Sequence, residues 1–129
     1  MNNINKFKIT FIIGTRPEAI KIAPVILEFQ KSKKFSIEII LTGQHDDMIK
    51  PVIEIFNLKE DINLKVIQKS KTLEDITSNL LKSLSILFEK IKPTIVFVQG
   101  DTVSALAGAI SAFYKNIKVA HIEAGLRTN

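Results

Sequence analysis

The fold is decided by residues 7–17, whose sequence is FKITFIIGTRP. Residues 7–13 are a nearly continuous run of apolar and β-branched side chains, which predicts a strand buried on both faces of a sheet. Gly14 ends this run, and Pro17 suits the first turn of a helix, with Thr15 as a candidate N-cap. A buried strand that leads through a tight turn into a helix is typical of parallel α/β sheets.

Strand and helix patterns alternate along the rest of the chain. Further strands are expected at residues 37–41, 64–67, 95–98 and 118–122, and helices at residues 17–32, 46–56, 72–91 and 102–115. Thr72 and Asp75 form a capping-box-like start for the third helix, whereas Pro24 is expected to kink the first helix or end its first turns. The small residues of the fourth helix would let it lie close to the sheet.

This alternation predicts an α/β fold, a doubly wound parallel sheet with helices on both faces. The common strand order for such a sheet is 3-2-1-4-5, which places the first and fourth strands side by side at the switch point. We expect the fourth and fifth strands, residues 95–98 and 118–122, to be central and buried.

The composition fits a single globular domain. The chain has 129 residues, 46% of them hydrophobic and 24% charged, and these proportions exclude a disordered tail. The absence of cysteine excludes disulfides and thiolate metal sites. No apolar run reaches the roughly 18 residues of a membrane span, and the polar first residues are unlike a secretory signal. We therefore expect one domain over residues 1–129, in a cytoplasmic protein without a membrane partner.

The net charge of +5 does not indicate a nucleic-acid partner, because the lysines are scattered from Lys6 to Lys118 and the chain has no tryptophan and one tyrosine. The arginines are more informative. Arg16 and Arg127 are the only two, against sixteen lysines, and both lie in glycine-containing turns. Arginine offers a planar fork that suits phosphate or carboxylate, so these two are candidates for binding an anion. The alternative is that both are ordinary surface residues.

Polar residues gather where the predicted strands end. In an open α/β sheet, ligands bind outside the carboxyl ends of the strands at the switch point. The segments there are residues 14–18, 42–45, 99–102 and 121–127, which include both arginines and both histidines. Two carboxylates, Asp101 and Glu123, follow neighbouring strands and could serve as acid and base.

Each of these residues also has a purely structural interpretation. Asp101 could cap the helix that begins near residue 102, His121 could be a core histidine, and His45 could be a plain loop residue. The turn from Gly14 into the first helix suits an anion, although neither the P-loop nor the dinucleotide-binding glycine pattern is present.

Four segments carry a resemblance to a known family. They are GTRPEAIK at residues 14–21, TGQHDDM at 42–48, QGDT at 99–102 and AHIEAGLRT at 120–128. In this order they resemble the non-hydrolysing UDP-N-acetylglucosamine 2-epimerases. The hydrolysing epimerases of sialic acid synthesis are a weaker match, since they typically lack the Arg-Pro-Glu opening and the Glu-Ala-Gly-Leu-Arg run.

The resemblance implies a glycosyltransferase-B-like fold of two Rossmann-like domains with the active site between them. It implies an isomerase of polysaccharide biosynthesis that interconverts UDP-N-acetylglucosamine and UDP-N-acetylmannosamine, without an added cofactor or metal. UDP is eliminated to give a 2-acetamidoglucal and is then added back. The complete enzyme is expected to be a homodimer.

The resemblance also implies roles for single residues. Arg16 and Lys21 match substrate-contacting positions, with Arg16 the candidate for the diphosphate, and Asp101 and Glu123 match the catalytic carboxylates of this half. Gln44 and His45 match a segment that binds a second, regulatory UDP-N-acetylglucosamine in some bacterial members. Ser70-Lys71 stands where regulated members carry an Arg-Gln pair, which disfavours allostery here.

Family members are well over twice as long as this chain. A further catalytic glutamate, a histidine and most of the uridine pocket belong to parts that these 129 residues do not contain. Val103 also replaces a threonine that many members carry. We therefore expect residues 1–129 to be the N-terminal domain of such an epimerase and to be inactive alone. The alternatives are a half-domain of a glycosyltransferase and a stand-alone module that binds nucleotide sugars.

Overall fold

A computed structural model describes residues 6–125. They contain a parallel sheet of five strands in the order β3-β2-β1-β4-β5, as the sequence predicts. The strands are β1 (Phe7–Ile13), β2 (Phe35–Leu41), β3 (Ile62–Asn63), β4 (Ile95–Gln99) and β5 (Lys118–Ile122). The predicted switch point between β1 and β4 is therefore present.

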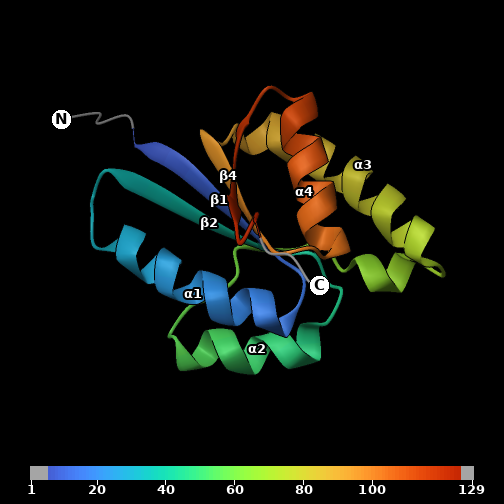
Figure 1. The fold of residues 1–129 in the computed structure, drawn as a ribbon, viewed down its shortest axis with the longest axis horizontal. Coiled ribbons are helices and arrows are strands. Elements are labelled where there is room, and N and C mark those ends of the chain that lie inside the picture. Colours follow the sequence, from blue (N-terminus) through green and yellow to red (C-terminus); the bar gives the residue numbers. More distant parts are fainter. Residues whose placement is uncertain (1–5, 126–129) are drawn as a thin grey trace.

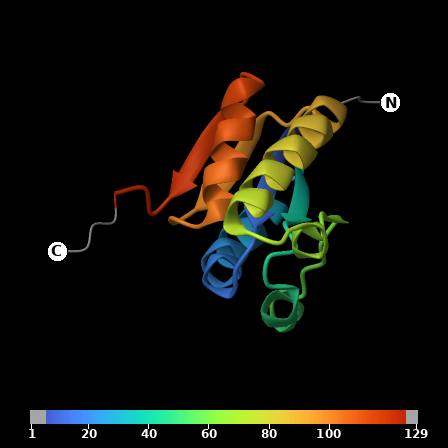
Figure 2. The same ribbon diagram turned by 90° about the vertical axis from the view of Figure 1, so that its right-hand side faces the viewer.

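Helices cover both faces of the sheet. They are α1 (Arg16–Gln30), α2 (Asp46–Ile55), α3 (Leu73–Ile91) and α4 (Val103–Tyr114), with a short 3₁₀ helix, η1 (Val66–Lys69), before α3. Figure 1 shows the strands between a layer of α1 and α2 and a layer of α3 and α4. Figure 2 shows α3 and α4 next to each other on the same face of the sheet. No helix among residues 6–125 is long and apolar enough to cross a bilayer.

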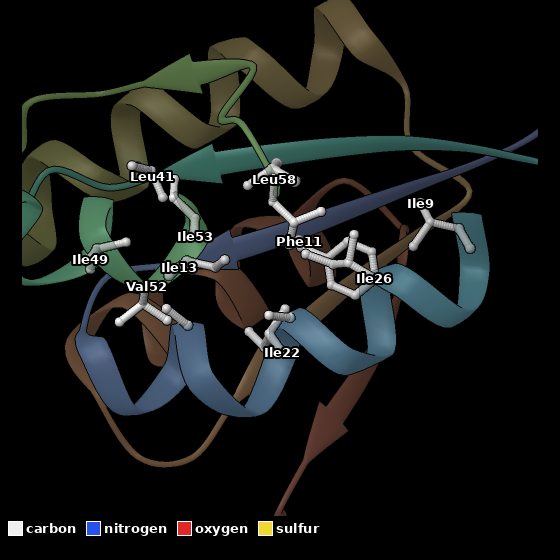
Figure 3. Packing of buried hydrophobic residues seen from close by; sticks show 13 residues of the cluster. Ile9, Phe11, Ile13, Ile22, Ile26, Leu41, Ile49, Val52, Ile53 and Leu58 are labelled. Atoms are coloured by element: carbon white, nitrogen blue, oxygen red, sulfur yellow. The ribbon is translucent and has the colours of Figure 1, made fainter. Parts of the chain in front are cut away.

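Each face of the sheet has its own apolar core. Phe11 and Ile13 of β1 pack toward α1 and α2 in a cluster that Figure 3 shows from close by. Ile12 points to the opposite face and packs with residues of β4, α3 and α4. A β-carbon on Gly108 would lie 2.9 Å from the Val98 side chain, so this glycine lets α4 approach β4 closely. The close approach predicted from the small residues of this helix is confirmed.

The helix starts follow the predicted signals. At α3, the Thr72 hydroxyl accepts a hydrogen bond from the Asp75 N–H at 3.1 Å, and the Asp75 carboxylate accepts one from the Thr72 N–H at 3.2 Å. This reciprocal pair satisfies two backbone donors that the helix itself leaves open. Thr15 takes the N-cap position of α1, as expected.

The predicted bounds of the third strand are wrong, and so is the alternative that Pro24 ends the first turns of its helix. The third strand is Ile62–Asn63, and residues 66–69 form η1, because Lys65 adopts a left-handed conformation (φ 50°) that ends the strand. The helix α1 continues through Pro24 to Gln30. Pro24 is exposed while its neighbours on the inner face are buried, so packing keeps this helix formed despite the missing backbone donor.

The prediction that the fourth and fifth strands are both central is half right. Val96 and Val98 of β4 are fully buried between β1 and β5. Strand β5 lies at the edge of the described sheet, and Val119 is 38% exposed. The strand order explains the difference, since the last strand of a 3-2-1-4-5 sheet has a neighbour on one side only.

We expect Val96→Asp to unfold the 129-residue chain. The substitution places an unpaired charge in the core, at a cost of several kcal/mol against a typical total stability of about 5–15 kcal/mol. Circular dichroism during heating measures the loss of the cooperative transition. The matched control is Val119→Asp on the exposed edge strand, which should melt cooperatively. A melt of Val96→Asp equal to that of the unsubstituted chain would contradict the buried position of β4.

Candidate functional site

A polar crevice opens at the carboxyl ends of β1, β4 and β5. It encloses about 380 Å³ and is lined by Thr15, Pro17, Lys21, Gln99, Gly100, Asp101, Thr102, His121, Glu123 and Ala124. A larger depression of about 490 Å³ beside α1 is lined mainly by apolar side chains. Of these two cavities, the first brings several titratable groups together at the switch point, so it is the candidate site.

Glu123 is held from two sides. Its Oε1 atom lies 2.5 Å from Nζ of Lys21 on α1, and its Oε2 atom accepts a hydrogen bond of 3.0 Å from Nε2 of Gln99 at the end of β4. The residue follows β5 in a left-handed conformation (φ 63°), which turns the chain out of the strand. The structure thus joins Lys21 and Glu123, two predicted site residues that lie far apart in the sequence.

Asp101 also lines the crevice, in the turn between β4 and α4. The turn depends on Gly100, which adopts a left-handed φ of 71° and donates its N–H to the carbonyl of Ile122 at 3.0 Å. The N-cap of α4 is Thr102, whose hydroxyl accepts from the N–H of Ala105 at 3.1 Å. Asp101 is therefore not the helix cap, and its exposed carboxylate is available to the crevice.

The structural interpretation made from the sequence is wrong for His121 and agrees with the structure for His45. His121 is exposed rather than a core residue, and its Nε2 atom lies 2.6 Å from the carbonyl oxygen of Gly100. His45 is exposed at the N-cap of α2, as a loop histidine would be. Among residues 6–125 no group of three histidine or carboxylate side chains is placed to hold a metal ion.

Glu18, which follows the crevice residue Pro17, is a buried carboxyl group that the sequence did not single out. It is 1% exposed, and its Oε2 atom accepts from the N–H groups of Gly14 at 2.5 Å and Thr15 at 3.2 Å. The hydroxyl of Thr102 donates to its other oxygen. The Thr15-x-x-Glu18 spacing is the capping-box signal that could have identified it. Glu18 thereby connects the β1–α1 turn to the start of α4.

Burial raises the pKa of Glu18 above its ordinary value. The hydrogen bonds from Thr102, Gly14 and Thr15 oppose this shift, and the charge of Asp101 adds to it. The net direction follows from desolvation, which disfavours the charged form of a carboxyl group.

The remaining predicted residues lie around the crevice or away from it. Arg16 is exposed at the first position of α1, between the crevice residues Thr15 and Pro17. Gln44 and His45 line a separate depression at the end of β2. There, Oε1 of Gln44 accepts from the Ser104 hydroxyl at 2.9 Å. Arg127 lies outside the described residues.

Fold and site together define a Rossmann-like domain with a polar crevice at its switch point, the place where ligands bind in open α/β sheets. The chain belongs to the UDP-N-acetylglucosamine 2-epimerase family, whose model matches residues 27–129. A curated relative of that name from Bacillus subtilis is 46% identical over 125 residues, covering 97% of this chain and 33% of the relative. A Neisseria meningitidis relative of the same name is 45% identical, covering 94% of this chain and 32% of the relative.

Solved structures agree. A crystal structure described as the Neisseria meningitidis epimerase bound to UDP-GlcNAc matches with a TM-score of 0.91 and 44% identity, over 95% of this chain and 33% of that one. A Streptomyces glycosyltransferase matches with a TM-score of 0.56 and 16% identity, over 89% of this chain and 38% of that one, which shows the fold alone. The predicted fold, a Rossmann-like sheet of the glycosyltransferase-B type, is confirmed. The chain spans about a third of the length of its relatives.

We expect the free energy of unfolding to depend on pH through Glu18. Because its pKa is raised in the fold, the folded chain binds this proton more tightly than the unfolded chain does. Stability from this group is present below pH 4.5 and is lost as the pH rises through the raised pKa. Urea unfolding at a series of pH values should show this loss, and Glu18→Gln should remove it.

The matched control is Glu28→Gln, which replaces an exposed carboxylate on the same helix and should keep the pH dependence of the unsubstituted chain. An unchanged pH dependence in Glu18→Gln would mean that Glu18 does not titrate differently in the two states.

Proposed function

We propose that residues 1–129 are the N-terminal domain of an enzyme that interconverts UDP-N-acetylglucosamine and UDP-N-acetylmannosamine. The observation that carries this proposal is the meeting of Lys21, Asp101 and Glu123 in one switch-point crevice, in a chain of the epimerase family. Relatives at 40–46% identity carry the epimerase name, and one related structure is described as bound to UDP-GlcNAc. The rest of the active site would come from the part of the enzyme that corresponds to the other two thirds of its relatives' length.

The proposed reaction proceeds by elimination and re-addition. In the first step a base removes the proton from C2 of the sugar, a C1–C2 double bond forms, and the C1–O bond to UDP breaks. In the second step a proton returns to C2 on the other face while a diphosphate oxygen of UDP bonds to C1 again. Atoms and charge balance without an oxidant or a reductant.

Asp101 and Glu123 are the proposed acid–base groups of this domain. Positioned groups of this kind typically contribute about 10²–10⁴-fold each to a proton transfer. The two residues follow neighbouring strands, β4 and β5, and both line the crevice. Both residues are exposed, but Glu123 has each carboxylate oxygen in contact with a donor, Lys21 or Gln99, whereas Asp101 lies in the turn before α4. The two carboxylates therefore have different environments, which suits them to different roles.

Arg16 and Lys21 are the proposed contacts to the diphosphate. Both lie in the first turns of α1, whose backbone N–H groups and dipole favour an anion at this end. Arg16 offers two parallel donors to phosphate oxygens, while Lys21 supplies a point charge next to Glu123. Gln44 and His45 line a separate depression and take no part in the proposed reaction, so they stay candidates for a second UDP-sugar site.

The two alternatives considered from the sequence have less support. A glycosyltransferase half-domain is supported by the fold alone. A stand-alone binding module gains nothing from the paired carboxylates. We expect the complete enzyme to be a cytoplasmic homodimer without a nucleic-acid partner.

In the complete enzyme, Asp101→Asn and Glu123→Gln should each lower the turnover number by about two orders of magnitude or more, with the fold retained. The assay is interconversion of the two UDP-sugars in D₂O, with deuterium at C2 as the mark of proton exchange. Glu54→Gln, an exposed carboxylate on α2, is the control that should keep full activity. The 129-residue chain alone should show no turnover. Full activity in both site variants would overturn the assignment of these carboxylates.

Arg16→Lys in the complete enzyme should raise the Michaelis constant for the UDP-sugar although the charge is retained. Lysine cannot supply the second parallel hydrogen bond of the guanidinium, and losing one hydrogen bond to a charged group costs about 1.5–3 kcal/mol. Steady-state kinetics measure this change. Equal Michaelis constants in the two proteins would leave Arg16 as a surface residue of the turn.

A further inference from the structure

Gln99 is a buried amide at the edge of the crevice. It is the last residue of β4, is 4% exposed and follows the fully buried Val98. A buried primary amide is costly unless its polar atoms have partners. The Nε2 atom of Gln99 donates a hydrogen bond to Oε2 of Glu123 at 3.0 Å.

Glu123 depends on such contacts for its orientation. It follows β5, the edge strand, and its side chain is 32% exposed, so the backbone alone does not restrict its rotamer. Two donors reach it, one on each carboxylate oxygen: Lys21 from α1 and Gln99 from β4. The carboxylate is thus held between a helix and a strand that belong to different parts of the chain.

The two donors differ in stiffness and charge. The Lys21 side chain is 45% exposed and ends on a flexible four-carbon stem, while Gln99 emerges from a central strand and is enclosed by its neighbours. Lys21 also carries a charge that substrate phosphate would attract. Gln99 is uncharged and enclosed, so it can hold the Glu123 carboxylate in place while Lys21 turns toward a ligand.

We propose that Gln99 is a positioning residue that orients the Glu123 carboxylate for proton transfer at the sugar. This inference rests on the proposed function, because Glu123 is one of the proposed acid–base groups. Gln99 acts through Glu123 and has little surface of its own to offer a substrate. Its effect therefore falls on the turnover number and not on substrate binding.

The test uses the complete enzyme with Gln99→Met, which keeps the length of the side chain and removes the donor. Turnover should fall by roughly ten- to hundredfold, the size expected for a displacement of about 1 Å in a reacting group, with little change in the Michaelis constant. Gln99→Asn, which keeps an amide but is one methylene shorter, should show the same loss. Gln30→Met, an exposed glutamine on α1, is the control that should keep full turnover.

A double-mutant cycle separates positioning from a structural role. In a Glu123→Gln background, Gln99→Met should cause no further loss of turnover, because residues that act as one unit are not additive. Multiplying effects, unchanged turnover in both Gln99 variants, or a change confined to the Michaelis constant would overturn the positioning role. If Gln99→Met does not fold, as judged by its thermal transition, Gln99→Asn decides the same question.

These outcomes are distinct from failure of the proposed function. A complete enzyme that interconverts the UDP-sugars and loses activity on Glu123→Gln, but is indifferent to Gln99, overturns only the positioning role. A complete protein that does not interconvert them overturns both proposals.

Discussion

The buried carboxylate of Glu18 is the interaction on which the site depends. A carboxylate removed from water is costly unless donors surround it, and Glu18 receives two backbone N–H groups of the β1–α1 turn and the hydroxyl of Thr102. Thr15 and Thr102 both line the crevice, and Thr102 is next to Asp101 in the sequence. One side chain therefore ties the β1–α1 turn to the start of α4, and its removal would leave buried donors without a partner.

Close packing reinforces this connection at Gly14. A β-carbon at this position would lie 1.9 Å from the Ser104 hydroxyl, so only glycine lets the turn after β1 lie against the start of α4. The same hydroxyl lies 3.0 Å from the hydroxyl of Thr42 and donates to Gln44. The ends of β1 and β2 and the start of α4 thus form one hydrogen-bonded unit. These shared partners connect the loops that lie beside the crevice.

The two carboxylates that line the crevice are less enclosed than these hydrogen-bonded loops. Asp101 is exposed in its turn, and Glu123 follows an edge strand and is held by Lys21 and Gln99. In the proposed enzyme this difference is useful, since the packed loops position carboxylates that must still reach a ligand. The chain spans a third of its relatives, so these residues form one side of the proposed site.

Most of the local structure and the strand order follow from the sequence alone. The apolar run of β1, the capping box of α3 and the polar strand ends all report on neighbours a few residues apart, and they placed Arg16, Asp101 and Glu123 at one edge of the sheet. The folded domain was needed to show that Lys21 and Gln99 both contact the Glu123 carboxylate. It also shows that Glu18 connects the β1–α1 turn to the start of α4 and that α1 continues through Pro24. The physical reason is that such contacts depend on strand register and helix packing summed over the whole domain. Periodicity shows which face a residue occupies, but not which distant side chain it meets.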